Sequence, residues 1–468
     1  MTTLQIKGEV IVPDRSTPPS QSVSRWSDKG IIAHPALVVV PESEEDIKAA
    51  INYAQSTGLQ VLPAGGGHGS FVPIGSKTLY MNMKQFNQVS VNSTAHTITV
   101  AGGVLTGQVI KAVTEKGFYT TWTNSNAVGF IGGILGGGNP TLAGIHGMQI
   151  DQVLSVRLVT GEGKALEVSP SSMGDELALF NAICGAGHGF GVITSLTLKI
   201  FPISNLHLAE EGVWVRRLIF PPPALETAAT VFEKLQPLSP ESTAALVFAR
   251  APPTAPKPGA PMVILTVTYY GPATDAESAF PILFDKAVTS KTIVAVTAPT
   301  QLAKLNDALA HFDVKGDRKD IQSAALSKVV PETITTAFQK WLVFTEQYAD
   351  AKRTTLVLSS YSKDKNMEIS QSPEGKARYF DNRDRGFNVL IFSWSSTDST
   401  EAASNEFSKE IKALYRSGSL TSELPRTLLN NIAPDTKADE LFTENQAKEL
   451  KRLVGVWDPT CLFWRPLI

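Results

Sequence analysis

The stretch "VLPAGGGHGSFVPIGS" (residues 61–76) decides the fold, because it places the glycine-rich segment 65–69 directly after an apolar run. Glycine lets the backbone adopt positive φ and lets a ligand approach the main chain, since no Cβ stands in the way. Consecutive backbone N–H groups in such a loop form a concave site that suits a pyrophosphate. His68 lies inside the loop, and a neutral imidazole is nucleophilic. Taken alone, the loop is either an ordinary turn or a site for a phosphorylated ligand.

The sequence before this loop predicts a strand, a helix and a second strand. Leu37–Val40 is apolar and β-branched, and Ser43 is suited to cap a helix with apolar residues on one face. Gly58 ends that helix, and residues 59–62 begin the next strand. The glycine loop therefore follows a βαβ unit.

Two further glycine clusters occur in the first 200 residues, at 129–147 and at 185–191. The second, "GAGHGFG", follows a predicted helix and precedes a predicted strand. A dinucleotide-binding Rossmann motif requires the reverse order, and the chain has no phosphate-binding P-loop. Three clusters together favour a large phosphorylated cofactor that is bound in another way.

The composition excludes several classes of function. A chain of 468 residues with a net charge of −2 has no field that would gather nucleic acid or an anionic membrane. No apolar run reaches the about 18 residues of a membrane span, and the first residues lack a secretory pattern, so we expect a cytoplasmic protein. Two cysteines allow at most one disulfide, and the seven histidines lack metal-ligand spacing, so no metal is expected. After Pro202 the composition is α+β with antiparallel character.

Several ordered motifs resemble one enzyme family. They are "RWSDKGIIAHPALVVVPESEEDIKAAI" (residues 25–51), "GGGH" (65–68) and "WDPTCLF" (457–463). With them the chain resembles the berberine-bridge-enzyme-like FAD-linked oxidases of the vanillyl-alcohol-oxidase and p-cresol-methylhydroxylase superfamily. The resemblance covers most of residues 20–202 and, more weakly, 425–468. It is thin but present in the middle, at "FDVKGDRKDIQSAALSKVV" (312–330) and "ARYFDNRDRGFNVLIFSW" (377–394).

The resemblance implies an α+β fold with a two-part FAD-binding domain of the p-cresol-methylhydroxylase type. Residues 1–203 and 425–468 would form that domain, and residues 204–424 would form an α+β substrate domain on an antiparallel sheet. The residues implied to line FAD are Ala64, Gly65, Gly66, Gly67, His68, Gly69, Ser70, Ser125, Asn126, Val128, Gly129, Gly132, Gly133, Asn139, His146, Gly191, Val192 and Cys461.

Four of these positions carry particular expectations. His68 matches the histidine that the family joins to the 8α-methyl group of the flavin, although Ala64 replaces the usual arginine of that loop. Ser125 stands where many relatives attach the flavin a second time through cysteine, so the resemblance implies a single attachment. His146 is either a cofactor-lining residue or a loop histidine. Cys461 replaces an asparagine of the tail motif, and on general grounds a small residue of this type is buried.

The catalytic base is the main departure from the family. Its usual tyrosine, in a Tyr-x-Asn pattern, corresponds to Leu428 here, while Asn430 keeps the asparagine. Leucine cannot accept a proton. The base is therefore Tyr361, Tyr348, Tyr379 or a carboxylate, or the substrate loses hydride without a base, or the reaction depends on cavity shape as in a cyclisation.

We therefore predict an FAD-dependent oxidase that takes hydride from a small secondary metabolite and reduces dioxygen to hydrogen peroxide. The alternatives are a flavin-binding cyclase and a flavin-binding scaffold without catalysis. The sequence indicates neither the substrate nor the oligomeric state.

Overall fold

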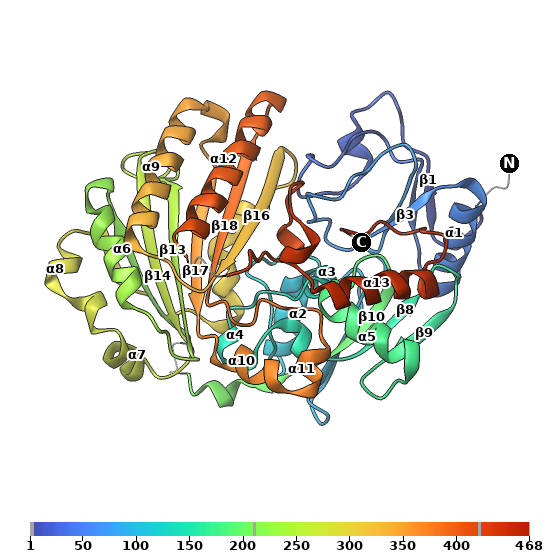
Figure 1. The fold of residues 1–468 in the computed structure, drawn as a ribbon, viewed down its shortest axis with the longest axis horizontal. Coiled ribbons are helices and arrows are strands. Elements are labelled where there is room, and N and C mark those ends of the chain that lie inside the picture. Colours follow the sequence, from blue (N-terminus) through green and yellow to red (C-terminus); the bar gives the residue numbers. More distant parts are fainter. Residues whose placement is uncertain (1–3, 209–211, 420–422, 468) are drawn as a thin grey trace.

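The computed structural model describes residues 4–208, 212–419 and 423–467. It contains two small sheets in the N-terminal half and one large antiparallel sheet that follows them (Figure 1). The predicted mixed α+β architecture with an antiparallel sheet is confirmed. No helix of the described residues has both the length and the apolar character needed to cross a bilayer.

The first sheet contains the predicted βαβ unit. Its strands are β1 (Glu9–Ile11), β2 (Leu37–Val40), β3 (Gln60–Ala64) and β4 (Thr78–Asn82), in the order β1-β2-β4-β3. Helix α1 (Glu44–Thr57) begins at Ser43, whose side chain accepts a hydrogen bond from the Asp46 nitrogen at 3.2 Å. It ends at Gly58, which is left-handed with a φ of 68°. Strand β4 lies between β2 and β3, so the glycine loop leaves the edge of this sheet.

The second sheet is antiparallel throughout. Its strands are β5 (Val89–Asn92), β6 (Thr97–Ala101), β8 (Val153–Val159), β9 (Ala165–Val168) and β10 (Val192–Lys199), in the order β5-β6-β10-β8-β9. Helices α2 (Thr106–Thr114), α3 (Phe130–Leu135), α4 (Ala143–His146) and α5 (Gly174–Ala186) and the ribbon of β7 (Phe118–Tyr119) and β11 (Phe201–Pro202) complete this half. The predicted helix before "GAGHGFG" and strand after it are confirmed as α5 and β10.

The large sheet has seven strands in the order β15-β12-β14-β13-β17-β18-β16. They are β12 (Trp214–Phe220), β13 (Ser242–Arg250), β14 (Pro261–Tyr269), β15 (Val294–Thr297), β16 (Arg318–Leu326), β17 (Thr355–Tyr361) and β18 (Phe387–Ser395). Helices α6 (Leu225–Lys234), α9 (Pro331–Gln347) and α12 (Asp398–Ser417) cover one face (Figure 1). Shorter helices are α7 (Ala273–Ala279), α8 (Lys286–Thr289), α10 (Asp364–Gln371) and α11 (Pro373–Ala377).

The opposite face of this sheet is only half-buried. Alternate strand residues such as Leu246, Val263 and Leu356 pack under the helices, whereas Val247, Ile264 and their neighbours point the other way. Tyr361 and Leu390 on this second face contact the hydrophobic core of the N-terminal half. The half-buried face is therefore turned toward the glycine-rich loops.

The C-terminal segment returns to the N-terminal half. Helix α13 (Glu444–Trp457) lies beside α5 and the second sheet (Figure 1). Beyond it, Leu462 and Phe463 enter a core with Val61 and Val192, and the Val61 nitrogen donates to the Leu462 carbonyl at 2.9 Å. Residues about 400 positions apart along the chain thus share one core between the two small sheets.

Candidate functional site: two glycine loops around His68

Two glycine-rich loops meet backbone to backbone. One follows β3 and contains residues 65–70, and the other precedes α3 and contains residues 125–129. A Cβ on Gly129 would lie 2.5 Å from the Gly66 nitrogen, and a Cβ on Gly66 would collide with the Gly129 nitrogen. Neither position has room for a side chain. The structure therefore brings together two segments that the sequence assigned to one cofactor.

The His68 ring stacks on an indole and leaves one ring nitrogen without a hydrogen bond. Its ring lies on the indole of Trp26, with 4.3 Å between centroids and 12° between planes. The buried Nε2 has no hydrogen-bond partner among the described residues. Burial, and then the charges of Lys319 and Arg25, lower the pKa of His68 to about 3. The imidazole is therefore neutral at physiological pH and keeps a free lone pair.

Arg25 and Lys319 are two cations at this site that sequence reasoning missed. The buried Arg25 guanidinium donates a hydrogen bond to the Gly69 carbonyl, and burial lowers its pKa. It supplies a positive charge to the loop in which Ala64 replaces the family arginine. Lys319, from β16, is fully buried, and its Nζ lies 4.8 Å from the centroid of the Trp26 ring. Both come from segments quoted for the family resemblance, but nothing in the local sequence placed them beside His68.

Strand β16 also holds the end of the first loop. Ser70 donates from its Oγ to the Asp320 carboxylate at 2.8 Å, and Lys29 pairs with the same carboxylate at 2.5 Å. Because Asp320 follows Lys319 directly, consecutive residues of one strand bind Ser70 and contact the Trp26 ring on which His68 stacks. The large sheet thus helps to fix the glycine loop.

The second loop is fixed from both sides. Ser125 donates to the Asp313 carboxylate at 2.7 Å, and the Asn126 amide donates to Asp307 at 3.0 Å. The Val128 carbonyl accepts hydrogen bonds from the backbone and hydroxyl of Thr106. These contacts position the loop, and they occupy the side chain that stands in place of the family cysteine.

Asn430 reaches helix α3, which follows the second loop, from the C-terminal segment. Its Nδ2 donates to the Gly133 carbonyl at 2.7 Å, and its side chain contacts the position where Gly136 would carry a Cβ. Leu428 is buried, and its nitrogen donates to the Ser323 hydroxyl of β16 at 3.1 Å. Asn430 is thus at the site, whereas Leu428 is a packing residue beside the large sheet.

The three candidate tyrosines lie in different places. Tyr361 is buried at the end of β17, facing the N-terminal half, and accepts a long hydrogen bond (3.4 Å) from Asn388. Burial raises its pKa, so its hydroxyl stays protonated. Tyr379 is buried beside the kinked end of α5, and burial raises its pKa to about 12. The structure does not bring Tyr348 to the loops, because it follows α9 on the helix-covered face and packs on Phe344.

Other sequence candidates lie further from His68. His146 stacks on Phe201 at 3.8 Å and bonds the Tyr119 hydroxyl at 2.8 Å, a packed loop position where burial lowers its pKa to about 4. Asn139 continues the second loop, and Gly191 and Val192 begin β10 beside Val159.

Cys461 corrects an expectation. It was expected to be buried, but its side chain is exposed and its φ is 51°. Asp458 accepts hydrogen bonds from the nitrogens of Leu462 and Phe463, which turns the chain at Cys461 and points the thiol outward. Cys184 is buried, and both cysteines are free.

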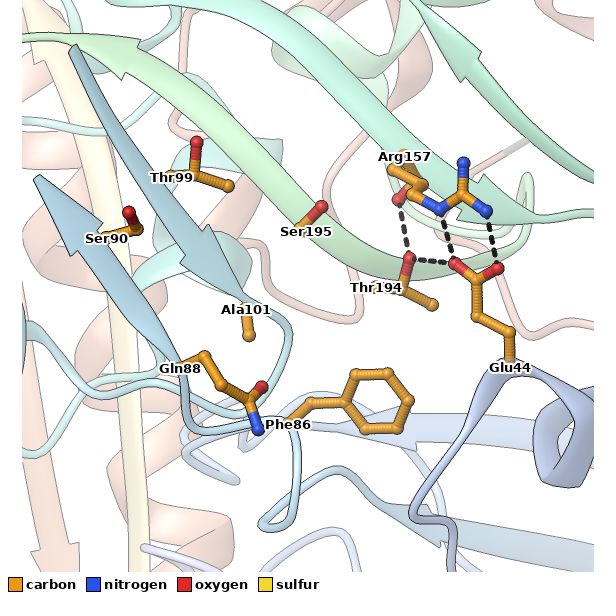
Figure 2. A pocket seen from close by; sticks show the side chains of 9 residues that line it. All are labelled: Glu44, Phe86, Gln88, Ser90, Thr99, Ala101, Arg157, Thr194 and Ser195. Atoms are coloured by element: carbon orange, nitrogen blue, oxygen red, sulfur yellow. Dashed lines mark hydrogen bonds and ion pairs between the residues drawn. The ribbon is translucent and has the colours of Figure 1, made fainter. Parts of the chain in front are cut away.

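Two cavities lie elsewhere on the described molecule. A cleft of about 250 Å³ lies between α1 and the second sheet, where Glu44 bonds Arg157 and Thr194 (Figure 2). A second cavity, of about 490 Å³, includes His207, Tyr270 and Lys365. Neither is lined by His68 or Gly66, and no group of three or more His, Cys, Asp or Glu side chains in the described part of the chain is arranged to hold a metal ion.

Comparison with known proteins places both loops inside the match to an FAD-binding domain. A family model described as an FAD binding domain matches residues 35–169. The FAD-linked oxidoreductase hasG of Aspergillus fumigatus is 27% identical over 97% of this chain and 95% of its own length.

Solved structures agree in fold. The berberine-bridge-enzyme-like protein 1 of Physcomitrella patens superposes with a TM-score of 0.80 at 18% identity, covering 98% of this chain and 96% of that chain. Glucooligosaccharide oxidase of Acremonium strictum, described with 6-S-cysteinyl, 8α-N1-histidyl FAD, superposes with a TM-score of 0.77 at 16% identity, covering 98% and 96% of the two chains.

The residues of the site fit FAD. The side-chain-free meeting of Gly66 and Gly129, together with the Arg25 guanidinium, suits a pyrophosphate, and the unpartnered imidazole of His68 suits the edge of a flat ring. The protein is therefore an FAD-binding oxidoreductase that is similar over most of its length to a fungal FAD-linked oxidoreductase and has the fold of the berberine-bridge-enzyme-like protein of Physcomitrella patens.

Proposed function

We propose that this protein is an FAD-dependent oxidase that takes hydride from a small organic substrate and reduces dioxygen to hydrogen peroxide. The observation that carries the proposal is the neutral, unpartnered His68 ring at the meeting of the two glycine loops. The names of its FAD-linked relatives and of the oxidases that share its fold support the same reaction. Bound FAD supplies the hydride acceptor, which dioxygen reoxidises.

We propose that different segments of the chain bind FAD and the substrate. Residues 1–203 and 425–468 hold FAD, through the loops at 64–70 and 125–133 and through Asn430. Residues 204–424 bind the substrate on the half-buried face of the large sheet. Pockets between such parts of a chain are where small molecules usually bind.

We further propose that His68 attaches the flavin covalently through its 8α-methyl group, and that this is the only attachment. In this step a His68 nitrogen forms an N–C bond in place of one C–H bond of the methyl group. The methyl C–H and the imidazole N–H would each release a proton, and the two electrons of the C–H bond would reduce dioxygen, which takes up two protons and becomes hydrogen peroxide. The histidyl flavin of the Acremonium oxidase supports the link, while Ser125, bonded to Asp313, replaces a second, cysteinyl one.

The side chains on the half-buried face of the large sheet support the proposal that the substrate is apolar. Ile264, Val247, Val357, Leu390 and Ser323 lie side by side across five strands in one row. The four apolar members of the row are partly exposed, and Leu390 adjoins the core of the N-terminal half. An uncharged, largely apolar secondary metabolite fits this row better than a strongly hydrated substrate does.

A second candidate function is a cyclisation in the same cavity without net redox turnover. It is favoured by Leu428, which replaces the family base, and by the raised pKa of Tyr361, which makes that phenol a poor proton acceptor. Either reaction leaves Tyr361 in a role as hydrogen-bond donor to substrate rather than as base.

The first experiment is an absorption spectrum of the purified protein before and after acid precipitation. A flavin band near ~450 nm that stays in the pellet, and that moves to the supernatant in His68→Ala, is the expected result. Flavin that leaves wild-type protein in acid would remove the covalent link but keep FAD binding. Substrate-dependent bleaching without oxygen, with peroxide formed in air, would then identify an oxidase. Product without bleaching or peroxide would identify the cyclase.

A further inference from the structure

A column of alternating cations and aromatic rings runs from the large sheet to His68. The exposed Arg353 guanidinium lies 3.3 Å from the centroid of the Trp394 ring, and Lys319 Nζ lies 4.5 Å from the same ring. Lys319 Nζ is also 4.8 Å from the Trp26 ring, on which His68 stacks. Cations over indole faces are attracted by the ring quadrupole, and more strongly where water is excluded.

Lys319 is an unusual member of this column, because it is fully buried without an ion-pair partner among the described residues. Its Nζ donates to the Val314 carbonyl. Its backbone is bonded in both directions by the Ser27 hydroxyl, at 2.9 Å and 2.6 Å. Burying a lysine costs free energy that two ring faces and one carbonyl offset only in part, so the residue is costly for stability alone.

Trp26 has little freedom to move. Its indole Nε1 donates to the Phe312 carbonyl at 2.7 Å, and its backbone nitrogen donates to the Gly67 carbonyl at 3.0 Å. Its ring is buried between the ammonium of Lys319 and the imidazole of His68. The orientation of the His68 ring therefore depends on Trp26, whose other contacts include Lys319 of β16.

We propose that Lys319 is a positioning residue for flavin attachment, which holds Trp26 against His68 and keeps a positive charge beside the imidazole. This inference rests on the proposed attachment at His68. The charge also opposes protonation of His68, since a third cation next to Lys319 and Arg25 is disfavoured, and only the neutral ring can form the bond.

The expected pH dependence of flavin attachment follows from the charged groups around Lys319. Burial is the main cause that lowers the pKa of Lys319 to about 8. Asp317 opposes this change, as do Asp28 and Asp313 to a smaller extent, whereas Arg353 adds to it. Lys319 is therefore charged below about pH 8 and neutral above it. His68, which Lys319 and Arg25 face, is neutral on both sides of that pH. A fall in attachment above pH 8 would thus report on loss of the cation that holds Trp26 against His68, and not on protonation of His68.

The test uses full-length apoprotein, produced under flavin limitation and mixed with FAD, and measures acid-stable flavin against time and pH. Lys319→Gln keeps a donor for the Val314 carbonyl but loses the charge, and we expect attachment about tenfold slower than in wild type. Lys319→Arg keeps the charge and should restore most of the rate, without the fall above pH 8. Arg318→Gln is the matched control, because it removes a neighbouring cation that pairs with Glu401 away from Trp26.

Wild-type attachment in Lys319→Gln, or Lys319→Arg as slow as Lys319→Gln, would overturn the inference. If Lys319→Gln does not fold, the comparison of wild type with Lys319→Arg across pH 8 decides alone. If wild-type flavin is released by acid, the attachment at His68 fails instead. The part of the inference that places a positive charge beside His68 is then decided by the nuclear magnetic resonance titration of His68 in ¹³C-histidine-labelled protein. A shift of that titration to higher pH in Lys319→Gln supports it, and an unchanged titration overturns it.

Discussion

Gly66 has to be a glycine for steric reasons. A methyl group at this position would collide with the backbone of Gly129 and with the Ala127 carbonyl. We expect Gly66→Ala to lower the free energy of unfolding by about 1–3 kcal/mol and to reduce flavin content, since one loop must move away from the other. Denaturant unfolding and the flavin-to-protein absorbance ratio measure the two effects. Gly75→Ala is the control, because nothing lies within 4 Å of its added Cβ. Equal effects of the two substitutions would contradict the argument.

Some residues of the site could be predicted from the sequence, and others could not. The glycines and His68 were predicted because one short stretch carries both the backbone freedom and the imidazole. Arg25 and Lys319 were not, because their role depends on which distant segment lies beside them. Ser27 and Lys319 are 292 positions apart, and no local pattern specifies that contact. The exposed side chain of Cys461 was missed for a different reason, since the general tendency of cysteine to be buried takes no account of the local turn that Asp458 makes with Leu462 and Phe463.

Among the elements, helix α1 is tied to the second sheet through Glu44. Its carboxylate accepts two hydrogen bonds from Arg157, each at 2.7 Å, and one from the Thr194 hydroxyl at 2.8 Å (Figure 2). The bonds from Arg157 come first among the causes that lower the pKa of Glu44. The folded state therefore prefers the ionised carboxylate.

We expect Glu44→Gln to lower the free energy of unfolding by about 1 kcal/mol at pH 7, because the pair is partly exposed. The pKa is lower in the folded state, so the stabilisation is present above the unfolded value and is lost as pH falls through the folded one. The difference between wild type and variant should shrink steadily below pH 4.5, the ordinary value for glutamate. Denaturant unfolding at several pH values measures it, and a difference independent of pH would refute the assignment. Glu45→Gln, on an exposed side chain, should change stability by less than about 0.5 kcal/mol.

Most of the helices and strands around the first glycine loop could be predicted from the sequence, because hydrophobic periodicity and helix caps are local features. Strand β2, helix α1 and strand β3 lie where the pattern placed them, with the Ser43 cap and the left-handed Gly58. The order of the strands in the sheet could not be predicted from the sequence. Strand β4 pairs with both β2 and β3, and this choice depends on packing across the whole sheet rather than on either neighbour.

For the whole molecule, a buried ion pair joins the segment before β18 to the N-terminal half. Arg383 donates to both oxygens of Asp151, at 2.9 Å and 2.7 Å, and both side chains are almost fully buried. We expect Arg383→Met to lower the free energy of unfolding by about 3–5 kcal/mol, because it leaves a buried carboxylate unpaired. Adding Asp151→Asn should recover part of that loss. Lys340→Met, which removes an exposed pair with Glu410, should cost about 1 kcal/mol or less. A loss for Arg383→Met as small as that for Lys340→Met would contradict the expectation.

The entry of Leu462 and Phe463 between the two small sheets has a consequence for how the protein is made. Their partners Val61 and Val192 leave the ribosome long before them, and at about 5–20 residues per second roughly 20–80 s separate Val61 from Phe463. The sheet that is synthesised first is thus among the last to be completed. Until translation reaches residue 463, its core presents an open apolar slot, and a nascent chain halted in that interval is a substrate for chaperones rather than for flavin.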